Sequence, residues 1–267
     1  MFYLIITTII WSFSFSLIGN YLSTDINSWS LAFLRSTIAC IFFLRWIDFK
    51  IPFSYILKIV LIGALQIGIM YMLYLNAFNY TSVQKILLFT ITTPFYVTMI
   101  SQIINKKIKL FAFFIALISI LGALVIRMTD LNTGDFVGFI FIQLANISFA
   151  LGQVLYKIIK ADNKISTNVY TDFSFFFIGA SFITLIGLMI STSSYTQPSS
   201  TSQWLLVLWL GGGASGIGYY FWNHGATQVR VETLATMNNL VIPLGLFIEV
   251  LFSGFVNLIS VPGFRLI

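Results

Sequence analysis

The chain has 267 residues, of which 58% are hydrophobic and 8% are charged, and its mean hydropathy is +0.96. A soluble domain has roughly 25% charged and 45–50% apolar residues, so the composition excludes an ordinary soluble domain and indicates an integral membrane protein. The net charge of +6 does not indicate nucleic-acid binding, because the basic residues lie between apolar runs, where they report membrane topology. The single cysteine, Cys40, excludes a disulfide or a cysteine metal site within the chain, and no cofactor or metal is expected.

Nine apolar stretches are each long enough to cross, as a helix, a hydrocarbon core of roughly 30 Å. They cover residues 2–22, 29–46, 55–78, 83–103, 108–127, 136–157, 167–190, 203–225 and 231–253. Their connections are short and polar, and no soluble domain lies between them. The sequence therefore predicts an all-α integral membrane protein, a bundle of nine transmembrane helices in contact with lipid.

The lysines and arginines are distributed unequally over the connections. Alternate connections carry ten of them, and the opposite connections carry only Lys85 and Arg127. Cytoplasmic loops of membrane proteins are enriched in basic residues. We therefore expect a protein of the cytoplasmic (inner) membrane whose amino terminus faces the cytoplasm.

Two helix pairs, 63–94 and 212–243, share a framework at a constant offset of 149 residues. The coinciding pairs are Gly63 with Gly212, Tyr71 with Tyr220, Ala77 with Ala226, Thr90 with Asn239, and Pro94 with Pro243. A proline inside a helix clashes with the carbonyl four residues earlier, so we expect a kink or an unwound turn at both prolines. Repeated, interrupted apolar helices are a sequence pointer to a transporter's substrate site, although two buried pairs with ordinary proline kinks would give the same pattern.

A repeat unit of five helices, an odd number, inserts its two copies into the membrane in opposite orientations. We therefore expect two inverted five-helix repeats, residues 1–130 and 131–267. By the same offset a tenth helix would begin near Leu258, yet the nine residues that follow it are too few to span. The tenth helix is either truncated or absent from a nine-helix variant.

Several of these stretches also carry a family resemblance: W-S-F-S-F from Trp11, L-A-F-L-R-S-T-I-A from Leu31, A-F-N-Y-T-S-V-Q-K-I-L-L-F-T-I-T-T-P from Ala77, and Y-F-W-N-H-G-A from Tyr220. Through these motifs residues 8–253 resemble the EamA-type members of the drug/metabolite transporter superfamily. The resemblance implies a carrier that moves a small metabolite, often an amino acid, across the inner membrane by alternating access. The missing tenth helix departs from the family pattern.

Polar residues inside the spans mark a candidate site near the bilayer middle, counting about 1.5 Å of rise per residue. The predicted substrate-binding residues are Trp11, Ser14, Gln66, Thr90, Asn146, Ser215 and Asn239. Gln66 maps onto Ser215 and Thr90 onto Asn239, so inverted repeats would bring both pairs toward one axis. This lining has no net charge and suits a neutral or zwitterionic solute resembling an amino acid. The same residues could instead form hydrogen bonds between helices.

Three ionisable residues could serve charge or proton coupling. Arg35 lies deeper than a snorkelling side chain should, and it would pair with a solute carboxylate or hold a carbonyl or carboxylate of its own chain. His224 and Glu249 lie closer to the helix ends and could titrate during transport, although simple hydration would also explain them.

A glycine cluster and the scattered acidic residues complete the sequence signals. Gly212 and Gly216 have G-x-x-x-G spacing, which predicts close helix packing. No metal or acid-base cluster is evident, which disfavours an integral-membrane enzyme. The sequence therefore favours a secondary transporter, with a truncated, inactive transporter gene product as the alternative. It does not identify the solute or the oligomeric state.

Overall fold

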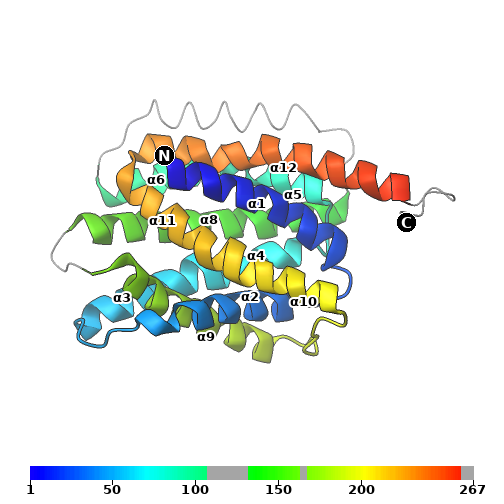
Figure 1. Ribbon diagram of the computed structural model, residues 1–267. Helices are drawn as coiled ribbons and strands as arrows, with labels where there is room; N and C mark the ends of the chain where they lie inside the picture. Colours follow the sequence, from blue (N-terminus) through cyan, green and yellow to red (C-terminus); the bar gives the residue numbers. More distant parts are fainter. Residues whose placement is uncertain (107–131, 163–166, 260–267) are drawn as a thin grey trace.

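The computed structural model describes residues 1–106, 132–162 and 167–259, with side chains up to residue 252, and every regular element in these ranges is helical. The helices lie roughly parallel in one bundle (Figure 1). Helix α1 packs against α12 at one side and α2 packs against α9 at the other, with α8 between them. The all-helical bundle confirms the predicted fold class.

The described helices match the predicted spans to within a few residues. They are α1 (Phe2–Tyr21), α2 with η1 (Ser28–Trp46), α3 with η2 and α4 (Phe53–Ala77), α5 with η3 and α6 (Val83–Ile104), α8 (Thr133–Ala161), α9 (Val169–Ile190), α10 with η4 and α11 (Thr201–Gln228), and α12 (Val231–Ile259). Seven of these segments are long and apolar enough to cross a membrane; Thr201–Gln228 is not among the seven. The predicted span 108–127 and the chain beyond residue 259 lie outside the described residues, so the count of nine helices stays a prediction.

Polar residues in the connections determine where several helices begin. The side-chain oxygens of Asn27 and Asn168 each accept a hydrogen bond from the backbone nitrogen two residues on, at the starts of α2 and α9. Asn132 and Asp135 form a reciprocal capping box at the start of α8. Because the first backbone N–H groups of a helix have no partner within it, these caps satisfy donors that would otherwise lie near the apolar core.

The two helix pairs that coincide at the 149-residue offset share an irregular segment. The long helix Phe53–Ala77 contains a π-helical stretch, η2 (Ala64–Ile69), and Thr201–Gln228 contains another, η4 (Trp209–Ile217). Gln66 and Ser215, which coincide at that offset, lie one in each π stretch. The shared irregularity agrees with the division into two repeats, which stays a prediction.

The two prolines behave differently. Before Pro94 the helix tightens into the 3-10 turn η3 (Thr90–Thr92), so the expected interruption is present there. By contrast, α12 stays α-helical through Pro243, so no unwound turn forms at that position and a kink there stays a prediction. A change of helix type beside the proline is therefore confined to the first pair within the described chain.

Glycines allow α3 and α9 to approach closely. A Cβ atom on Gly63 would lie 1.9 Å from the carbonyl oxygen of Phe176, and one on Gly179 would lie 1.9 Å from that of Val60. The predicted packing role of Gly212 is wrong, because a Cβ atom on this residue would meet no neighbouring atom within 4 Å. The second glycine of that spacing, Gly216, does pack against α2, where an added Cβ atom would lie 3.6 Å from the Phe43 ring and 3.9 Å from the Cα atom of Ala39.

We expect Gly179→Ala to lower the melting temperature of the purified protein and Gly212→Ala to leave it unchanged or raise it. Both changes add one methyl group to a helix, but only the first forces a backbone carbonyl to move, at a cost of about 1–3 kcal/mol. Thermal unfolding in one detergent, followed by intrinsic fluorescence, compares the two variants. Equal melting temperatures would contradict this account of the α3–α9 contact.

Candidate functional site

A cavity lies inside the bundle, where seven helical segments face one another. Its lining residues are Trp11, Ser14, Phe15, Arg35, Met70, Tyr71, Tyr74, Thr90, Thr93, Ile142, Ala145, Asn146, Phe149, Tyr219, Trp222, Asn238 and Val241. The space open to the centres of water molecules is about 110 Å³, several times the ~10–15 Å³ that one water requires. The cavity therefore has room for a solute or for several waters.

Aromatic rings form one wall of the cavity around Trp11. The rings of Tyr219 and Trp222 lie 4.9 and 5.0 Å from that of Trp11, and Phe149 lies 5.8 Å away in an edge-on arrangement. The indole Nε1 donates a hydrogen bond of 2.9 Å to the carbonyl oxygen of Ala214, which lies in the π stretch η4. This bond ties α1 to the irregular part of Thr201–Gln228 and holds the Trp11 ring at the wall.

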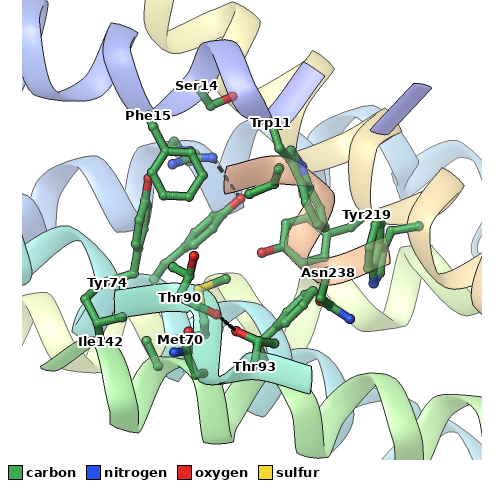
Figure 2. A pocket seen from close by; sticks show the side chains of 17 residues that line it. Trp11, Ser14, Phe15, Met70, Tyr74, Thr90, Thr93, Ile142, Tyr219 and Asn238 are labelled. Carbon is green, nitrogen blue, oxygen red and sulfur yellow. Dashed lines mark hydrogen bonds between the residues drawn. The ribbon is translucent and has the colours of Figure 1, made fainter. Parts of the chain in front are cut away.

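A second pair of rings lies across the cavity. Figure 2 shows Phe15 and Tyr74 on the side opposite Trp11 and Tyr219. The centroids of Phe15 and Tyr74 are 5.4 Å apart and their planes are nearly perpendicular. Two aromatic walls suit a compact apolar ring system between them.

The 3-10 turn before Pro94 is held by two amides of α8. The carbonyl oxygen of Phe89 accepts hydrogen bonds of 3.1 Å from both Gln143 Nε2 and Asn146 Nδ2. The Thr90 carbonyl oxygen, to which Pro94 cannot donate, accepts both the backbone N–H of Thr93 and, at 2.7 Å, the Thr93 hydroxyl (Figure 2). The interruption therefore places Thr90 and Thr93 at the cavity in a fixed geometry.

Two side-chain amides present acceptor oxygens at the cavity. The Nδ2 groups of Asn146 and Asn238 are engaged with carbonyl oxygens, of Phe89 and Leu234 respectively. Within the described chain no hydrogen bond reaches either Oδ1 atom, and neither atom is fully enclosed. These oxygens can accept hydrogen bonds from N–H groups of a solute.

One positive charge lies at the cavity. Arg35, near the middle of α2, is only 3% exposed and is part of the lining. No carboxylate or carbonyl oxygen of the described residues accepts a hydrogen bond from it; its partners are the hydroxyls of Tyr71 and Ser215. The prediction that the lining has no net charge is therefore wrong.

The structure brings together four of the seven predicted substrate-binding residues: Trp11, Ser14, Thr90 and Asn146 line the cavity. Gln66 is fully buried against Gly152 of α8, and Asn239 is half-buried outside the lining, where its neighbour Asn238 takes the position at the cavity. Ser215 is also outside the lining and hydrogen-bonds to the lining residue Arg35. Binding of a solute by any of these residues stays a proposal.

The other two ionisable candidates lie away from the cavity. The ring of His224 stacks on Tyr220 at 5.9 Å near the end of α11. The carboxylate of Glu249 is buried between α1, α5 and α12 and accepts hydrogen bonds from Asn20 and Gln84. Neither is part of the lining, and a role in proton coupling stays a prediction for both.

Sequence reasoning missed most of the aromatic lining. Tyr71 and Phe149 had a signal, since Tyr71 coincides with Tyr220 at the 149-residue offset and Phe149 coincides with Trp11 at an offset of 138 residues. Phe15 and Trp222 lie in motifs that carry the family resemblance, but Tyr74 and Tyr219 had no signal, because 28 phenylalanines, 12 tyrosines and six tryptophans are spread over the chain. Depth in the membrane does not distinguish a ring that faces a cavity from one that faces lipid.

Comparisons with known proteins agree with this fold. Residues 1–128 match the EamA-like transporter family. The chain is 38% identical over 251 residues to proteins named biotin transporter from Salmonella typhimurium and Escherichia coli K12, covering 92% of this chain and 82% of each relative. It is 37% identical over 253 residues to a probable biotin transporter of Pseudomonas aeruginosa, covering 93% of this chain and 87% of that protein.

A solved crystal structure of a protein shares the fold. It superposes with a TM-score of 0.69 at 16% sequence identity, covering 95% of this chain and 88% of the other. The fold therefore extends over almost the whole chain, and the identity to the curated relatives does as well. From these matches and the helical bundle, the chain belongs to the EamA-like transporter family of the drug/metabolite transporter superfamily and is a multi-pass small-molecule transporter.

Proposed function

We propose that this protein carries biotin, or a solute of the same build, across the cytoplasmic membrane by alternating access. The observation that carries the proposal is the 38% identity, over 92% of the chain, to proteins named biotin transporter. The chemical groups that line the central cavity support the proposal independently, because they match the groups of biotin.

Biotin has a compact fused ring system with a polar urea at one edge and a flexible chain that ends in a carboxylate. The aromatic walls around Trp11 and Phe15 offer apolar surface to such a ring system. The amide oxygens of Asn146 and Asn238 offer acceptors to the two N–H groups of a urea. Arg35 supplies a positive charge for an anionic solute.

An amino acid, the solute expected from the sequence, fits the cavity less well. Its ammonium group would need a carboxylate or several acceptors within the apolar surroundings. Among the described residues that line the cavity there is one arginine and no aspartate or glutamate. We therefore propose a monoanionic solute in place of a zwitterion.

Alternating access would use the irregular helices. Thr90 of the 3-10 turn η3 lines the cavity. The π stretches η2 and η4 end within two residues of the lining residues Met70 and Tyr219. Irregular turns are places where a helix can bend at low cost. We propose that the inverted repeats rock around these turns to open the cavity to one side at a time.

Growth of a biotin-requiring bacterium that lacks its own biotin carrier tests the function. Cells that express this chain should grow at biotin concentrations that do not support cells carrying an empty vector. Accumulation of radiolabelled biotin should rise in parallel and should fall when excess unlabelled biotin is added. Expressed, membrane-inserted protein without any gain in growth or accumulation would argue against biotin as the solute.

The orientation proposed from the basic connections can be tested by cysteine labelling. With the amino terminus in the cytoplasm, a cysteine at Ser194 should react with an impermeant thiol reagent added outside, and one at Lys50 should not. The chain's own Cys40 is replaced by alanine first. The opposite labelling pattern would reverse the proposed orientation.

Neighbouring asparagines of α12 give a matched pair of variants. Asn238→Ala should lower biotin uptake by about tenfold, because it removes an acceptor at the cavity, whereas Asn239→Ala should leave uptake close to normal. Both variants lose the same amide at adjacent positions of one helix. The measurement is the initial uptake rate of each variant, corrected for the amount of protein in the membrane. A larger loss from Asn239→Ala than from Asn238→Ala would mean that the Asn239 face of α12 contacts the solute.

A further inference from the structure

The guanidinium of Arg35 is held in place by a chain of hydroxyl groups. Its Nη2 donates to Tyr71 Oη at 2.9 Å and its Nε donates to Ser215 Oγ at 3.3 Å, and its Cζ lies 4.2 Å from the centre of the Tyr71 ring. The Ser215 hydroxyl donates to the carbonyl oxygen of Leu210, five residues earlier in the π stretch η4. Two elements, α4 and η4, therefore position one side chain of α2.

The directions of these hydrogen bonds follow from donor counting. The Ser215 hydroxyl donates its one proton to the Leu210 carbonyl oxygen. Tyr71 Oη must therefore be the donor in its 2.6 Å hydrogen bond with Ser215 Oγ. Both hydroxyl oxygens then turn lone pairs toward Arg35, and neither can neutralise it. The hydroxyls orient the guanidinium without compensating its charge.

One edge of the guanidinium has no partner. Arg35 Nη1 is enclosed and donates to no acceptor of the described residues, and no described carboxylate lies within 4 Å of this side chain. The side chain is almost fully buried and lines the cavity. A buried cation with unused N–H groups is costly unless an anion completes it.

We infer that Arg35 is the anchor for a solute carboxylate, with Tyr71 and Ser215 as the residues that position it. The inference deepens the proposed function, on which it rests, by naming the chemical group that the cavity selects: a single carboxylate on a compact, otherwise uncharged body. One carboxylate balances the single buried charge, whereas an alcohol or amide leaves the charge uncompensated and a dicarboxylate adds an unpaired one. Arginine presents a planar fork that matches a carboxylate.

Equilibrium binding to the purified full-length chain in nanodiscs tests this assignment with two ligands that differ at one group. These are biotin and biotinol, in which the carboxylate is replaced by an alcohol. The wild-type protein should bind biotin at least ~30-fold more tightly than biotinol, as expected when one partner of a buried charge pair is lost. Arg35→Gln should bind both ligands alike, with the weaker affinity.

Arg45→Gln is the matched control, because Arg45 is exposed in the 3-10 turn η1 that follows α2 and stacks on Trp46, away from the cavity. It should retain the wild-type preference for biotin. Arg35→Lys keeps the positive charge but lacks the planar guanidinium, and it should retain part of the preference for biotin over biotinol. If Arg35→Gln does not fold, Arg35→Lys takes its place in the comparison. Unchanged biotin affinity in Arg35→Gln, or equal binding of biotin and biotinol by the wild type, would overturn the inference.

A second pair of ligands separates the anion site from the identity of the solute. Pentanoate at millimolar concentration should raise the melting temperature of the wild type and of Arg45→Gln but not that of Arg35→Gln, and pentanamide should have no effect on any of them. Binding of neither biotin nor biotinol, together with this pentanoate response, would reject biotin and keep the carboxylate anchor. If the wild type neither binds biotin nor responds to pentanoate, both biotin as the solute and Arg35 as the carboxylate anchor are rejected.

Discussion

Ala145→Phe should reduce biotin transport by more than about tenfold while leaving the protein folded in the membrane. Ala145 lines the cavity from α8 and is 3% exposed, so a phenyl ring at this position has the cavity itself as its nearest free space. A phenyl ring there would occupy space that a fused-ring solute needs, because only about 110 Å³ of the cavity is open to the centres of water molecules. Because the ring fills a void and meets aromatic neighbours, the cost to stability should stay within ~1–3 kcal/mol.

The preceding residue provides the control. Leu144 is 47% exposed on the outer face of the same helix, so Leu144→Phe adds a ring of the same kind on the lipid side. Initial rates of labelled biotin uptake, divided by the amount of protein in the membrane, should be normal for Leu144→Phe and near background for Ala145→Phe. Equal rates for the two variants would show that the solute does not pass through this cavity.

Trp11→Ala should lower biotin transport by roughly 10- to 100-fold. The change removes the ring that packs on Tyr219 and Trp222 and leaves the Ala214 carbonyl without its hydrogen bond. Loss of a solute contact and of an aromatic pair, each worth about 1 kcal/mol or more, would account for an effect of this size. Trp11→Phe keeps an aromatic ring but has no indole N–H. Its rate of biotin transport should lie between the rates of the unchanged protein and of Trp11→Ala.

A lipid-facing tryptophan controls for the general effect of this substitution. Trp209 begins the same π stretch that Trp11 contacts, and it is 46% exposed. Uptake by Trp209→Ala should be close to that of the unchanged protein, with binding affinity measured alongside to separate recognition from movement. Normal uptake by Trp11→Ala would remove Trp11 from the solute site.

The positions of the helices follow from the sequence because apolar run length and capping residues are local signals. The span expected at 29–46 is the segment Ser28–Trp46, and its start is explained by the cap at Asn27. The 3-10 turn before Pro94 also follows from a local rule. At Pro243 no unwound turn forms, since α12 is α-helical on both sides of the proline.

The candidate site was predicted less completely, because depth in the membrane does not give rotation about the helix axis. Asn238 and Asn239 have almost the same depth, yet successive residues of a helix differ by about 100° in direction, and Asn238 faces the cavity. The sequence also marked Arg35 by its depth but could not tell whether its partner belonged to the chain. That distinction requires the positions of Tyr71 and Ser215, which come from other helices.

Uptake of labelled biotin by the purified chain in sealed lipid vesicles tests the central claim most directly. The account predicts saturable accumulation above that of protein-free vesicles, competition by unlabelled biotin but not by biotinol, and loss of uptake in Ala145→Phe with retention in Leu144→Phe. Vesicles that contain folded protein yet take up no more biotin than protein-free ones, under either an imposed proton gradient or an outward biotin gradient, would contradict it.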